Sequence, residues 1–161
     1  MTQDTLFQLF YDWVTSIVGP SVTVIKSHSK GPAPLTPYIT IGMAGNWHQK
    51  GLPAHMTADP TLISPRIYDS EVELEIWESN GRGDLLRALV KAVDTCASIE
   101  LMEASGVAIL TTDGPSYIPA LEDSVWSTDF LLRLNLLVTE IETTDTTYIE
   151  TVELINQIGG T

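Results

Sequence analysis

Cysteine and basic residues are scarce in this chain, and its apolar runs are short. Of 161 residues, one is cysteine and 8 are lysine or arginine. A single cysteine, Cys96, excludes an internal disulfide, and there is no CxxC pair of the kind that holds zinc. No apolar run approaches the ~20 residues that cross a bilayer, and the N-terminus lacks the basic region of a secretory signal. We therefore expect a soluble protein, cytoplasmic when synthesised, that does not bind membranes.

The acidic excess narrows the classes of partner. Against those 8 basic residues stand 21 acidic ones, which gives a formal net charge of -13. Such a chain repels nucleic acid and has few cations with which to release counterions. Specific binding to DNA or RNA is therefore disfavoured. An acidic surface instead suits solubility, a basic protein partner, or a surface along which DNA slides without sticking.

The clearest strand and the clearest helix follow one another in the middle of the chain. From Asp69 to Trp77 apolar and acidic residues alternate strictly, which predicts a strand with one face in the core. A glycine-containing turn follows, and Asp84 to Ser98 then carries a single apolar stripe that predicts a helix capped by Asp84. Cys96 falls on this stripe, so we expect it to be a buried small hydrophobe.

Other elements add to this pair. The length and a hydrophobic fraction of 43% indicate one domain, 1–161. Apolar spacing predicts a helix over 5–18, ended by Gly19 and Pro20. Extended runs predict strands at 22–25 and 38–41, which would pair as a hairpin. A further strand is predicted at 106–111, before a turn at 113–115. An extended strand and hairpin are predicted over 126–155. Together these elements predict an α+β fold with a mainly antiparallel twisted sheet packed against two helices.

The segment from Gly42 to Arg66 shows no periodicity and is predicted to be a long irregular loop. Loops of this length inside a compact domain are uncommon and are usually functional or disordered. Trp47, His48 and His55 lie in it. These side chains either anchor the loop on the core or contact a partner. The sequence favours neither alternative.

Motifs for catalysis or cofactor binding are weak, so the sequence predicts no enzyme, no metal and no cofactor. The histidines are scattered, and no phosphate-binding glycine motif is complete. Glu71, Glu73 and Glu75 form a carboxylate cluster on one strand face, with neighbours ~6.6 Å apart. That spacing suits a pair of glycosidase carboxylates. Three glutamates in a row are, however, more typical of a solvated or partner-facing sheet surface.

The order of elements, with short residue matches, resembles the tail terminator or neck proteins of long-tailed bacteriophages. The matches are the N-terminal helix with Trp13, the strand 37–41 after a proline-rich approach, the block 68–76 with its glycine turn and helix, the strand at 106, and Trp126 opening a long amphipathic strand. The likeness spans residues 5 to 155. One departure is that Ser127, Thr128 and Asp129 follow Trp126, where the family has a basic residue.

The resemblance implies a virion structural protein, assembled in the host cytoplasm. It would form a ring, expected to be a hexamer, that ends tail-tube polymerisation and joins the tail to the head connector. Its partners would be itself, the tube protein, a sheath protein and the connector, with DNA passing through the lumen unbound. Glu71, Glu73, Glu75 and Arg133 are the candidate lumen or interface residues. Alternatives are another neck or tail completion component, a small hydrolase using the glutamate face, and a monomeric binding module.

Overall fold

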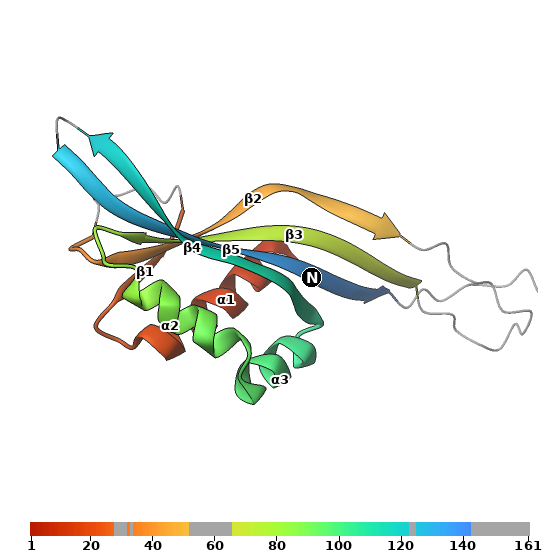
Figure 1. Ribbon diagram of the computed structural model, residues 1–161. Helices are drawn as coiled ribbons and strands as arrows, with labels where there is room; N and C mark the ends of the chain where they lie inside the picture. The colour runs from red at the N-terminus through yellow and green to blue at the C-terminus, as the bar shows by residue number, and fades with distance from the viewer. Residues whose placement is uncertain (28–31, 33, 52–65, 123–124, 143–161) are drawn as a thin grey trace, which may run out of the picture.

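In the computed structural model, helices cover one face of a mixed sheet, which confirms the predicted α+β class (Figure 1). The structure describes residues 1–27, 32, 34–51, 66–122 and 125–142. Within these ranges no helix is long and apolar enough to cross a membrane. The elements are α1 (Gln3–Val18), β1 (Thr23–Lys26), β2 (Tyr38–Gly51), β3 (Arg66–Ser79), α2 (Asp84–Val93), α3 (Cys96–Ala104), β4 (Val107–Glu122) and β5 (Val125–Glu142).

The strands lie in the order β1-β2-β3-β5-β4. Every neighbouring pair is antiparallel except β1 and β2, which run parallel. The predicted hairpin between these two strands is therefore wrong. A tight turn would have reversed the chain, whereas the connection from Ser27 to Pro37 is long enough to return past the four-residue β1 and start β2 at the same end.

The core lies between the helices and the facing side of the sheet. Thr2 caps α1, since its side chain accepts the Thr5 N–H at 3.2 Å. Trp13 is 2% exposed, and its indole N–H donates to Ser98 Oγ at 2.9 Å, which ties α1 to α3. The largest fully buried side chains come from helices and central strands: Leu6, Phe10, Ile39, Ile41, Leu74, Ile76, Leu86, Leu89, Leu132, Leu134 and Leu136.

The predicted helix over 84–98 is broken in two, so three helices cover the sheet rather than two. α2 stops at Val93, and Thr95 then caps α3 by accepting the Ser98 N–H at 3.4 Å. The same hydroxyl donates to the Ala92 carbonyl at 2.8 Å. The break rotates the second helix, and Cys96 is consequently exposed rather than buried. The local capping hydroxyl outweighed a continuous apolar stripe.

The predicted irregular loop over 42–66 is wrong for its first part, because β2 continues to Gly51. Its pairing with β3 shifts register between Ala44 and His48. This bulge removes the alternation on which a strand prediction depends, and pairing with the well-formed β3 compensates for weak intrinsic preference. The rest of the predicted loop, with His55, lies outside the described residues, as does the predicted return strand at 148–155.

The predicted long strand is confirmed as β5, and its partner β4 is longer than expected. The residues assigned to a turn at 113–115 instead form a bulge inside β4, where the register shifts between Asp113 and Ser116. Gly114 has φ +109, and a Cβ there would lie 2.6 Å from the Leu131 carbonyl oxygen. At about 3.3 Å per residue β5 extends about 60 Å, whereas α1 is about 24 Å long. Helices therefore cover only the middle of the sheet (Figure 1).

Candidate functional site

The sheet face opposite the helices carries the predicted glutamate row together with Arg133. Glu75 lies opposite Arg133 in the register of β3 and β5. The Arg133 Nε lies 3.1 Å from Glu75 Oε1 and 3.2 Å from Glu73 Oε1. The structure thus brings together residues predicted separately from two distant segments. One guanidinium lies between two of the carboxylates.

Polar contacts continue along the same face. Thr139 Oγ1 donates to Asp69 Oδ1 at 2.9 Å, and Asn135 donates from Nδ2 to Thr111 Oγ1 at 2.6 Å. The carboxylates of this row come from β3, and Arg133 pairs with Glu73 and Glu75. This surface, which we call the acidic face, is defined by Asp69, Glu71, Glu73, Glu75 and Arg133. Its formal charge is negative, so it repels phosphate groups.

Trp47 and His48, predicted to lie in a partner-contact loop, belong to β2. The backbone register places His48 opposite Glu71. The description of the structure does not extend to these two side chains, so their contacts stay a prediction. His55 lies outside the described residues.

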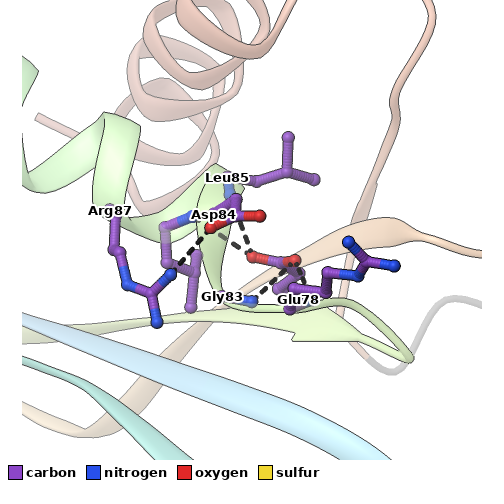
Figure 2. A network of polar contacts seen from close by, with 7 residues as sticks. Glu78, Gly83, Asp84, Leu85 and Arg87 are labelled. Carbon is purple, nitrogen blue, oxygen red and sulfur yellow. Dashed lines mark hydrogen bonds and ion pairs between the residues drawn. The ribbon is translucent and has the colours of Figure 1, made fainter.

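Glu78 is a buried carboxylate that the sequence reasoning missed (Figure 2). It is 2% exposed. Its Oε1 accepts the N–H groups of Arg82 and Gly83 at 3.0 Å each, and its Oε2 accepts those of Leu85 at 3.2 Å and Leu86 at 3.3 Å. These donors belong to the turn and first turn of α2, where helical N–H groups have no partner within the helix.

Glu78 therefore caps α2 from the neighbouring strand. The predicted cap, Asp84, is instead the first helical residue and pairs with Arg87 at 2.7 Å. Gly83 holds the N-cap position with φ +75 and supplies no side-chain cap. The sequence did contain a signal for this role. Glu78 falls on the same side of the alternating strand as Val72, Leu74 and Ile76, which predicts a carboxylate that faces the core. This carboxylate is fully engaged in holding the fold.

A hairpin arm projects beyond the helices at one end of the sheet (Figure 1). Pairing of β3 with β5 ends at Glu78 and Phe130, so the β5 residues before Phe130 pair with β4 alone. We call the strands 116–122 and 125–130 the arm. Trp126 is 67% exposed and Tyr117 is 54% exposed. The Tyr117 ring lies 5.4 Å from that of Phe130, which packs against the core at the base of the arm.

A cavity of about 240 Å³ lies between α3 and the first residues of β4. We call it the α3 cavity. Met102 and Val107, each 3% exposed, form its floor, and Ile99 at its edge is 45% exposed. Val93 and Ile109 complete the apolar lining, while Asp94 and Glu103 add acidic groups. The cavity is suited to an apolar side chain rather than to a phosphate or a carboxylate.

The described side chains contain no group of three or more His, Cys, Asp or Glu residues arranged to hold a metal ion. What they offer is a negatively charged sheet face, an arm with exposed aromatic side chains and an apolar cavity. Exposed aromatic side chains and concave apolar surfaces are each typical of protein–protein contacts.

Neither a family model nor a curated protein matches this chain. One solved structure, of a protein known only by a sequence identifier, aligns over 90% of this chain and 99% of its own. Its sequence identity is 15% and the TM-score is 0.36. A similarity this low carries no argument, so any inference about function depends on the residues themselves.

Proposed function

We propose that this protein is a structural component of a phage virion, which forms a ring at the head-proximal end of the tail. There it ends polymerisation of the tail tube and joins the tail to the head connector. The support is the order of elements and the short residue matches that resemble tail terminator and neck proteins. The resemblance also supplies the expected hexamer.

The observation that carries the proposal is the projecting arm. It extends past the helices of the described residues (Figure 1), and its aromatic side chains Tyr117 and Trp126 are exposed there. β4 is also an edge strand of the described sheet, and its outer row of backbone groups is available for pairing. A long edge strand with exposed aromatics is suited to contacts between subunits. A monomeric enzyme does not need one.

The acidic face fits the lumen of such a ring. Double-stranded DNA carries a dense row of phosphates, and proteins hold it by releasing counterions with lysine and arginine. A face on which carboxylates outnumber the guanidinium of Arg133 gives little such binding. DNA would therefore slide past Glu71, Glu73 and Glu75 rather than stick to them.

Two alternatives make different predictions. Another neck or tail completion component would share the ring but bind different neighbours, so partner identity separates the two. A small hydrolase would use the glutamate face, and replacing Glu73 by Gln would then abolish turnover. The Arg133 guanidinium, within 3.2 Å of Glu73 and 3.1 Å of Glu75, occupies the space beside both carboxylates and does not favour this alternative.

The test is to measure the solution mass of the purified protein over a concentration series, alone and with tail tubes, by native mass spectrometry. A ring-sized oligomer that also fixes tube length when added during tube polymerisation would support the proposal. A strict monomer that leaves tube length unchanged would overturn it.

A further inference from the structure

Trp126 on the arm and the α3 cavity lie on the same side of the sheet. The two register shifts between β4 and β5 each place the extra residue on β4, so along β5 Trp126 keeps the parity of Phe130, Leu132 and Leu134. Leu132 and Leu134 are fully buried under the helices, and Phe130 packs against the same core. Trp126 therefore points to the face that bears the helices, which is also the face that bears the cavity.

Trp126 cannot fill the cavity of its own chain. The cavity residue Ile109 pairs with Leu136 on β5. From Trp126 to Leu136, at about 3.3 Å per residue of uninterrupted strand, the distance is about 33 Å. The strand is paired throughout this length and cannot fold back on itself. Only another molecule can place the Trp126 indole there.

The positions of the two features suit a second copy of the chain. Figure 1 shows the arm at one end of the sheet, at the upper left. α3 lies beneath the sheet further to the right, and β4 runs from α3 to the arm. A contact between different surfaces of identical subunits is heterologous, and it closes into a ring when the rotation between subunits allows it. A projecting group and a hollow at separate ends of one subunit give that type of contact.

We infer that Trp126 of one subunit inserts into the α3 cavity of the next and that this contact joins the subunits into a ring. The inference rests on the function proposed above. Tyr117 packs beside it on the exposed apolar edge formed by Ile99. Two aromatic side chains bury about 300–500 Å². With an equal area on the neighbour the contact approaches the ~1,000 Å² of the smaller specific interfaces. Single pairs are thus weak, and closure of the ring stabilises them.

Charge gives the contact a distinctive salt dependence. The cavity carries Asp94 and Glu103, and the chain that would supply the arm has a formal net charge of -13. Like charges on both sides repel, and added salt screens that repulsion. Self-association should therefore strengthen as salt rises. A basic partner in the cavity would be displaced by the same salt.

The first experiment compares Trp126→Ser with Leu35→Ser by light scattering over a concentration series. Both residues are exposed, at 67% and 94%, so both variants should fold. Loss of a central Trp anchor should weaken association by about 30-fold or more. Leu35→Ser, outside the arm strands and outside the cavity lining, should associate like the wild type. Ile99→Asp should reproduce the loss from the cavity side.

The second experiment uses Cys96, which is exposed at the start of α3 and does not line the cavity. A bimane label on this cysteine should be quenched by the Trp126 of a neighbouring copy. Labelled Trp126→Ser protein should become quenched when unlabelled wild type is added. Unlabelled Trp126→Ser protein added instead should leave the emission unchanged.

The outcomes separate this contact from the proposed function. Rings that form and fix tube length equally well with Trp126→Ser would overturn the contact and leave the function standing. Trp126-dependent quenching in oligomers that do not affect tube length would support the contact and contradict the function. Association that persists with Trp126→Ser and weakens as salt rises would overturn self-insertion in favour of a contact between opposite charges.

Discussion

Glu75 and Glu78 lie on the same strand, and on opposite faces of the sheet. The side chain of Glu75 is 24% exposed and shares Arg133 with Glu73. Glu78 is 2% exposed and accepts four backbone N–H groups from the turn before α2 and from its first turn. One carboxylate is thus paired with a charge at the surface, and the other is solvated by the protein backbone.

The comparison teaches that a residue type does not determine a role. On the acidic face, water competes with every contact, so removing an ion pair there changes the free energy of unfolding little. On the face that the helices cover, no water replaces a lost acceptor, so removing the Glu78 carboxylate leaves several N–H donors without partners. The candidate functional residues lie on the acidic face and on the arm, because exposed side chains there are not needed to hold the fold.

The largest effect is expected from Glu78→Gln. The neutral amide keeps the size of the side chain but replaces one accepting oxygen by a donor that faces backbone N–H groups. Hydrogen bonds to charged groups contribute about 1.5–3 kcal/mol, and buried unsatisfied donors add to the loss. We expect the free energy of unfolding to fall by about 2–4 kcal/mol. Urea denaturation followed by circular dichroism measures it, with Glu75→Gln as the matched exposed control.

A loss for Glu75→Gln as large as that for Glu78→Gln would contradict the difference between the two faces. A normal stability for Glu78→Gln would show that α2 can find another cap.

A smaller loss is expected from Gly83→Ala. At φ +75 an added Cβ is strained, and it would lie 2.9 Å from the Phe130 ring that supports the arm. Gly19 has a similar φ of +82 with nothing within 4 Å of a Cβ. Gly19→Ala should cost about 1 kcal/mol from backbone strain alone, and Gly83→Ala about 1–2 kcal/mol more. Equal losses in thermal unfolding would mean that Phe130 moves aside without cost.

The smallest effect is expected from Arg133→Met. The Arg133 side chain is 44% exposed, and exposed ion pairs contribute between about 0 and 1 kcal/mol. Stability at low salt should fall by less than about 1 kcal/mol, since Glu73 and Glu75 then repel one another. The difference from wild type should shrink at high salt, where that repulsion is screened. A large loss that salt does not reduce would place Arg133 among the residues that hold the fold.

Strict local patterns gave correct predictions. The alternation of 69–77 is the centre of β3, and the apolar face of 5–18 lies in α1. Glu73, Glu75 and Arg133 were predicted as candidate residues, and the pairing of β3 with β5 brings them together. These successes share a cause: the period of a strand or a helix is set by backbone geometry and needs no distant partner.

The errors at β1, β2 and β4 share a cause, which is dependence on other parts of the chain, whereas the error at Cys96 is local. β2 beyond Gly42 and β4 beyond Asp113 contain glycine, proline and bulges, so their strand structure depends on β3 and β5 beside them. The direction of β1 depended on a connection whose path the residues alone do not specify. Cys96 was misplaced because the hydroxyl of Thr95 ended one helix and began another.

The sequence by itself determined the elements with strict periodicity, the acidic character of the chain and the row of glutamates on one strand face, because each depends only on neighbouring residues. Tertiary structure alone decided that Glu78 caps α2, that Arg133 lies between Glu73 and Glu75, and that Trp126 stands about 33 Å from the cavity on its own chain. Those features join segments far apart in sequence, and their positions exist only once the sheet is paired.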